Sequence, residues 1–116
     1  KMQEYLQITP ADDAEGILQD MHWSDGSFGY FPSYLLGSIY DGMYLDRLEE
    51  ELGSVDALLA EGRISEITKW LNEKIHQYGS TRSPKEVIRY VCGKEVSAEP
   101  LIRYFKEKYT KVYNLG

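Results

Sequence analysis

His22 is the residue of this sequence best placed to do chemistry. It follows Asp20 by two positions and precedes a turn rich in glycine and serine, residues 24–29, whose far side carries Tyr30 and Phe31. A histidine with an acid nearby and exposed backbone N–H groups in the adjacent turn can hold an anionic group of a substrate. From the pattern alone, a buried histidine with satisfied hydrogen bonds is the simpler interpretation, and the tyrosines would then be core or interface residues.

The other reactive side chains form no recognisable catalytic or metal-binding motif. The sequence has two histidines and one cysteine, and it contains no HExxH, CxxC, GxSxG, phosphate-loop or dinucleotide-binding motif. His76 lies late in an amphipathic segment, where a solvated histidine or one that pairs with a helix C-terminus is expected. Cys92 stands just before Gly93 at an expected helix end, and we interpret it as a buried structural thiol. The chain alone therefore cannot supply the three protein ligands of a common zinc site.

Composition and charge describe a soluble globular polypeptide. Hydrophobic residues make up 42% and charged residues 28% of the 116 residues, and no segment is apolar over the length of a membrane span. Residues 1–62 hold 13 acidic and two basic residues, a net charge of −11, whereas residues 63–116 carry +5. The basic residues of the second half alternate with acids at helical spacings, so we expect a solvated helix surface and no nucleic-acid or membrane partner. A single cysteine in so small a chain favours a reducing, cytoplasmic location.

The periodicity predicts an all-α chain. Glycine, proline and capping residues divide it into helices over about residues 1–7, 32–51, 55–62, 64–78, 84–93 and 98 onward, with a compact segment at 16–23. Ser83 and Glu86 have the spacing of a capping box with Pro84 at the first helical position. We expect the 64–78 helix to bury one apolar stripe, which comprises Ile64, Ile67, Trp70, Leu71 and Ile75, and the last helix to bury Leu101, Ile102, Phe105 and Tyr109.

The first half of the long helix, from Phe31 to Leu45, is apolar or small on nearly every side, and Asp41 is its only charged residue. A helix that is apolar all round belongs in the middle of a large core. A chain of this length has too little mass to cover such a helix. We therefore expect either another part of the same polypeptide or a partner subunit to surround it.

The segment GILQDMHW, Gly16 to Trp23, resembles the Gly-x-x-Gln-Asp-x-His-Trp motif of the thermostable (Taq-type) carboxypeptidase family. The following string SDGSFGYFPSYLLGSIY and the downstream EGRISEITKWLNEKIHQYGSTRSPKEVI are also similar to that family. The resemblance covers essentially the whole chain. It implies that residues 1–116 are one piece of a domain, the helical C-terminal segment of a larger, mostly helical zinc metallopeptidase.

The family resemblance also implies a function and a set of site residues. The full-length protein would be a carboxypeptidase that releases single C-terminal amino acids from peptides, with zinc held upstream of this chain by an HExxH helix and a later glutamate, and family members are generally homodimers. His22 would hydrogen-bond the substrate backbone or its terminal carboxylate, and Tyr30 would donate its hydroxyl to the oxyanion. Tyr34 is the second choice for either role, and Gln19 and Asp20 would brace the segment beside the substrate.

A second hypothesis keeps the helices and drops the chemistry. The aromatic long helix could serve a helical interaction or dimerisation module that has no catalytic activity of its own. Metal analysis and peptidase assays on this chain and on a longer one distinguish the two hypotheses.

Overall fold

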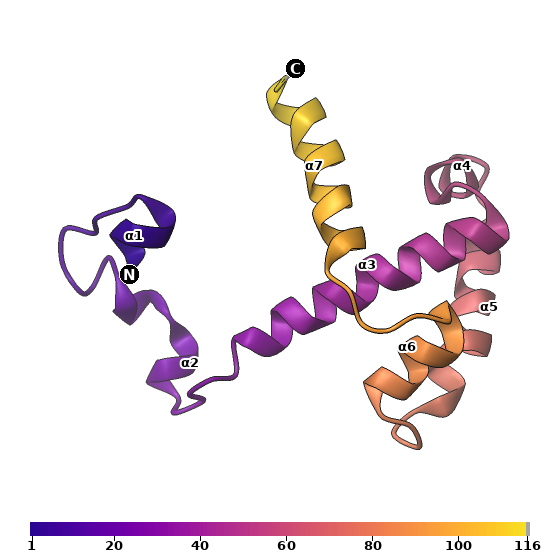
Figure 1. Cartoon of the computed structure of the whole chain (residues 1–116), viewed down its shortest axis with the longest axis horizontal. Helices are drawn as coiled ribbons and strands as arrows, with labels where there is room; N and C mark the ends of the chain where they lie inside the picture. The colour runs from indigo at the N-terminus through magenta and orange to yellow at the C-terminus, as the bar shows by residue number, and fades with distance from the viewer. Residues whose placement is uncertain (116) are drawn as a thin grey trace. The chain divides into compact units, whose positions relative to one another are not determined.

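The computed structural model of the chain describes residues 1–115. Its α-helices are α1 (Met2–Leu6), α2 (Met21–Ser24), α3 (Pro32–Leu52), α4 (Val55–Ala60), α5 (Ile64–Lys74), α6 (Pro84–Cys92) and α7 (Glu99–Tyr113), and its 3-10 turns are η1 (Ile17–Gln19) and η2 (His76–Tyr78) (Figure 1). No β-strand occurs among the described residues, and the predicted all-α class is confirmed. No helix within residues 1–115 is both long and apolar enough to cross a membrane.

The backbone contacts divide the chain into two compact units, Lys1–Leu35 and the remainder from Leu36 onward. Each unit is described separately below. The first unit holds α1, η1, α2 and the first turn of α3, and the second holds the rest of α3 and the helices that follow it. The expectation that residues 1–116 form one piece of a domain stays a prediction.

The second unit has a small core between α3, α5 and α6. Its buried members are Leu48, Trp70, Val87 and Val91, and partly buried side chains of α3, α4 and α5 pack around them. The Trp70 indole N–H donates to the Glu51 carboxylate at 2.8 Å, so the polar edge of the ring is satisfied. Partial burial pushes the pKa of Glu51 upward, but the hydrogen bonds from Trp70 and Lys74 outweigh it, and the pKa is lowered.

The helix ends follow the capping residues. The Ser83 hydroxyl accepts from the Glu86 backbone N–H at 3.4 Å, and the Glu86 carboxylate accepts from the Ser83 N–H at 2.7 Å, so the predicted capping box is confirmed. Helix α5 ends at Lys74, earlier than the expected Tyr78, because Ile75 leaves the helical region with φ −124° and ψ −63°. The chain continues to Tyr78 as the 3-10 turn η2.

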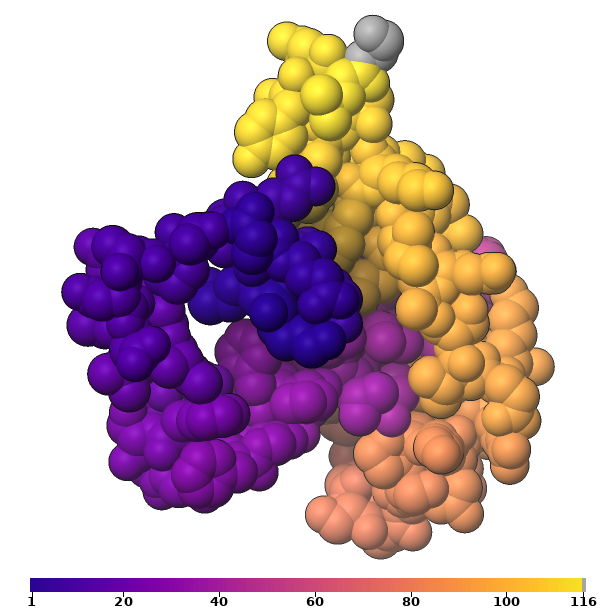
Figure 2. Space-filling model, turned by 60° about the vertical axis from the view of Figure 1, so that its left-hand side comes forward, coloured from indigo at the N-terminus to yellow at the C-terminus, as the bar shows by residue number. Residues whose placement is uncertain are grey.

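Helix α7 buries much less than expected. Leu101 is 8% exposed, whereas Ile102, Phe105 and Tyr109 are 49%, 41% and 42% exposed, so the prediction of a buried stripe is wrong for these three residues. The reason is that α7 contacts α3 chiefly through its first turns, and its later turns extend away from the other helices of this unit (Figure 1, Figure 2). Ile64 is also exposed, at 57%, because it is the first residue of α5.

Two contacts attach the start of α7 to α3. Gly42 lies so close to Leu101 that a Cβ at Gly42 would stand 2.9 Å from the Leu101 backbone nitrogen. Asp46, one turn further along α3, forms an ion pair with Arg103 of α7. The glycine is therefore required by the close approach of the two helices.

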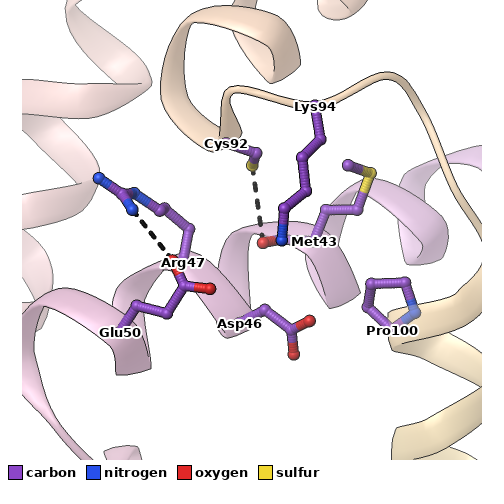
Figure 3. A pocket seen from close by; sticks show the side chains of 7 residues that line it. All are labelled: Met43, Asp46, Arg47, Glu50, Cys92, Lys94 and Pro100. Atoms are coloured by element: carbon purple, nitrogen blue, oxygen red, sulfur yellow. Dashed lines mark hydrogen bonds and ion pairs between the residues drawn. The ribbon is translucent and has the colours of Figure 1, made fainter.

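Cys92 lies in a small cavity of about 20 Å³ between α3 and α6, which has room for about one water molecule (Figure 3). Its thiol points to the Met43 carbonyl oxygen at 3.6 Å. Burial raises the pKa of the thiol, which keeps it protonated and unreactive. Cys92 is half-buried rather than fully buried, and these features fit the expected structural thiol.

Candidate functional site

His22 is held by Asp20 through two hydrogen bonds. Asp20 is the N-cap of α2, and one of its carboxylate oxygens, Oδ1, accepts from the His22 backbone N–H at 2.9 Å. The same oxygen lies 2.8 Å from Nδ1 of the His22 ring. The His22 side chain is 14% exposed, so the ring is largely enclosed and its orientation is fixed by its neighbours.

The contact with Asp20 also determines which ring nitrogen of His22 stays available for a ligand. The hydrogen bonds from the His22 ring and backbone hold the pKa of Asp20 below its ordinary value of 3.8, so Asp20 is an ionised acceptor at neutral pH. The proton on Nδ1 therefore points at Asp20. Nε2 is left for a ligand, as an acceptor when the ring is neutral and as a donor when the ring is doubly protonated.

The turn after α2 returns the chain to His22. The Ser27 N–H donates to the His22 carbonyl at 2.7 Å and to the Asp25 carboxylate at 2.9 Å. Gly26 and Gly29 adopt φ of 82° and 77°, which favours glycine and allows the chain to reverse within a few residues. The reversal places Tyr30 and Phe31, which precede α3, beside the imidazole.

Three aromatic rings surround His22. The ring centroids of Tyr30, Phe31 and Tyr34 lie 5.7, 5.4 and 5.6 Å from that of His22. Tyr30, two residues before α3, and Tyr34, in its first turn, also meet each other edge to face at 5.6 Å. Both tyrosines are exposed, at 53% and 56%, and within residues 1–115 neither hydroxyl has a hydrogen-bond partner. Two tyrosine rings therefore lie beside one oriented imidazole.

The remaining residues of the motif shape the segment. The Gln19 side-chain amide donates to the Ala14 carbonyl at 2.6 Å, which ties η1 to the preceding loop. A Cβ at Gly16 would lie 3.1 Å from the Pro10 ring, so the first residue of the motif is packed against that loop. Trp23 pairs edge to face with Phe28 at 5.4 Å across the turn.

The structure thus brings together His22, Asp20, Tyr30 and Tyr34, whereas Gln19 contacts the loop behind them. Sequence reasoning missed Asp25 as a residue that fixes this turn. Its signal is the Asp-x-Ser spacing of residues 25–27, in which the carboxylate accepts the N–H two residues on.

No metal site accompanies these residues in the described part of the chain. Within residues 1–115 no three side chains from histidine, cysteine, aspartate and glutamate come together in a group that could hold a metal ion. The described residues therefore do not fit a metal cofactor by themselves.

Comparison with known proteins gives this arrangement a family. The family model described as Carboxypeptidase Taq (M32) metallopeptidase matches residues 1–109. Carboxypeptidase 1 of Bacillus subtilis is 46% identical over 115 residues, which are 99% of this chain and 23% of that protein. Thermostable carboxypeptidase 1 of Thermus thermophilus is 35% identical over 113 residues, 97% of this chain and 22% of that protein.

A solved structure, titled BsuCP Crystal Structure, shares the fold with a TM-score of 0.82 and 46% identity, and the match covers 94% of this chain and 22% of that one. The chain thus spans less than a quarter of the relatives that it matches. The predicted resemblance is confirmed across nearly the whole chain, and this chain belongs to the Carboxypeptidase Taq (M32) metallopeptidase family.

Proposed function

We propose that the chain is the C-terminal part of a zinc-dependent carboxypeptidase that releases single C-terminal amino acids from peptides, and that it supplies substrate-binding and oxyanion-stabilising groups. Membership of a metallopeptidase family supports the class of reaction. The observation that carries the assignment to particular residues is the oriented His22 ring packed beside the rings of two exposed tyrosines.

His22 binds the end of the peptide through Nε2 in this proposal. A neutral ring accepts from a backbone N–H of the substrate, and a doubly protonated ring donates to its terminal carboxylate. Asp20 supports both states because its carboxylate accepts a hydrogen bond from the Nδ1–H group in each. The low exposure of His22 restricts water at the ring and strengthens either hydrogen bond.

Tyr30 donates its hydroxyl to the oxyanion of the tetrahedral intermediate, and Tyr34 is the alternative donor. A phenol whose ring packs against His22 can donate to the oxygen on which charge develops. Gln19 and Asp20 act on the substrate through the segment that they brace. No role in proton transfer is assigned to any of these residues.

The full-length protein is proposed to hold its metal through residues outside this chain; within residues 1–115 no group of three possible ligands comes together. We propose that it is zinc and that its ligands lie upstream. We also propose a cytoplasmic location, on the evidence of the single half-buried cysteine, and a homodimeric protein, as the resemblance implies.

The second hypothesis, a helical interaction or dimerisation module without activity, is favoured by one observation. Helix α7 exposes a row of aromatic side chains. This hypothesis predicts a stable stoichiometric complex and no peptidase activity in any length of the chain.

Substitution of each of the two histidines in turn tests the proposal. In the full-length protein, His22→Ala should abolish most turnover of a carboxypeptidase substrate while the metal content stays near that of the wild type. His76→Ala is the matched control, because His76 is exposed and its ring contacts Asn72 on α5. Loss of metal in the His22 variant would make His22 a ligand and refute the proposed role, and full activity would remove His22 from the site.

A further inference from the structure

The middle of α3 forms the floor of an open trough in the second unit. Gly42 and Asp46 of α3 contact α7, whereas Tyr44 and Leu48 pack in the core with α5. At 3.6 residues per turn, Leu45 lies between these two faces of the helix. The trough therefore has α3 as its floor and has α5 and α7 as its walls.

Three hollows open along this trough. One of about 310 Å³ and one of about 570 Å³ lie on either side of Tyr104 of α7. A third of about 400 Å³ is lined by the apolar face of α5, at Ile67, Leu71 and Ile75. Leu45 lines all three hollows, so they form one continuous surface.

Helix α7 leaves a row of aromatic rings exposed. Its aromatic rings follow one another along the helix, with centroid separations of 5.8 Å from Tyr104 to Phe105, from Phe105 to Tyr109 and from Tyr109 to Tyr113. All four are at least 40% exposed. A helix of 15 residues is marginal without tertiary packing, and a contiguous apolar surface of this kind marks an interface.

The floor carries two acids, Asp41 and Glu49. Glu49 lines the hollow of about 570 Å³, whose other charged residues are Asp56, Glu107, Lys108 and Lys111. Asp41 is the only acid that lines the two smaller hollows within residues 1–115, and it defines the chemistry of what covers them. Asp41 lines the hollows on both the α5 and the α7 side. Asp46, on the next turn, is paired with Arg103, but within residues 1–115 no side chain forms an ion pair with Asp41. Any apolar element that closes the trough buries this carboxylate and must bring a cation or a hydrogen-bond donor to it.

We propose that the part of the trough around Asp41, with the hollows of about 310 and 400 Å³, is the docking site of an apolar helix from the portion of the full-length polypeptide that this chain does not cover, and that this helix places a basic or hydrogen-bonding side chain opposite Asp41. The family relatives supply the length for it, because the chain matches only 22–23% of each of them. A second copy of the chain fits less well. Two troughs facing each other across a two-fold axis would bring two Asp41 carboxylates into one apolar interface.

Thiol labelling of two serine positions tests the proposal without reference to activity. Ser38 lines the hollow beside Tyr104, whereas Ser65 is exposed on α5. Ser38→Cys and Ser65→Cys change one atom each and are made both in the 116-residue chain and in the full-length protein. Maleimide labelling is then followed at each site by peptide mass spectrometry, which separates both sites from Cys92. Leu45→Cys repeats the measurement on the floor.

Both serine sites should react in the 116-residue chain. In the full-length protein Ser38→Cys should react slower than Ser65→Cys by at least about a factor of ten, and dilution should leave the difference unchanged. Protection that disappears on dilution together with dimer dissociation would assign the trough to a second copy and overturn the proposal. Equal labelling of the two sites in the full-length protein would leave the trough empty and overturn it too. The labelling results do not depend on the activity of His22 variants, so this proposal and the proposed function can fail separately.

Discussion

From the contact between α3 and α7 we predict that alanine has different effects on stability at two glycines of α3. Gly42 and Gly37 both lie inside α3. A Cβ at Gly42 would meet the Leu101 backbone at 2.9 Å from N and 3.2 Å from Cα, whereas a Cβ at Gly37 meets nothing within 4 Å. Gly42→Ala and Gly37→Ala therefore share the same change in helix propensity and differ in the clash.

The expected magnitudes follow from these two terms. Alanine in place of glycine stabilises a helix interior by roughly 0.5–1 kcal/mol. The neighbour of Gly42 is backbone and cannot rotate away, so the clash should cost about 1–3 kcal/mol, as overpacking does. We expect Gly37→Ala to stabilise the chain and Gly42→Ala to be less stable than Gly37→Ala by about 1–3 kcal/mol, which measures the clash alone.

Urea unfolding of the 116-residue chain, followed by circular dichroism, measures this difference. The short chain is the right sample, because other segments of the full-length protein can cover Gly37. Equal stabilisation by the two substitutions would show that Leu101 does not pack on Gly42, and the α7 wall of the trough would be refuted.

Three further predictions follow from the same contacts. Asp20→Ala should shift the His22 proton from Nδ1 toward a mixture of tautomers, which ¹⁵N chemical shifts of the ring report, and unchanged shifts would show that Asp20 does not orient the ring. Leu48→Ala should destabilise the chain by about 2–5 kcal/mol in urea unfolding, because Leu48 is 4% exposed, and a loss below this range would mean that the core is loose. Burial raises the pKa of Tyr44 to about 12 from 10.0, so the folded state holds this proton more tightly. Its contribution to stability is complete below pH 10 and is lost as the pH rises through 12. Tyr44→Phe should remove that part of the alkaline unfolding curve.

The local structure of the chain was largely predictable because it depends on local chemistry. The Ser83–Glu86 capping box and Ser54 as the N-cap of α4 each act through residues three positions away. Pro32 acts at its own position, where its fixed φ suits the first turn of α3. The site was predictable in part for the same reason. Asp20, His22 and Tyr30 lie within 11 residues, and two glycines in the intervening turn allow only a short return path.

The exposure of side chains was not predictable, because it depends on what lies beside each helix. The apolar period of α7 indicates which face needs a partner, but it does not reveal whether the partner is in the same chain. Phe105 and Tyr109 were expected to be buried and are exposed, since the described helices cover only the first turns of α7. The early end of α5 at Lys74 depends on the backbone of one residue, Ile75, whose sequence context continues the helical pattern.

The most direct test of the central claim, that this chain supplies donors to a catalytic centre whose metal lies elsewhere, is the rate of Tyr30→Phe in the full-length protein. Removal of one oxyanion donor should lower kcat by about 10²–10³ with little change in KM and with unchanged metal content. Tyr90→Phe, an exposed tyrosine on α6, is the matched control and should keep the wild-type rate. A Tyr30→Phe protein that turns over as fast as this control would contradict the account.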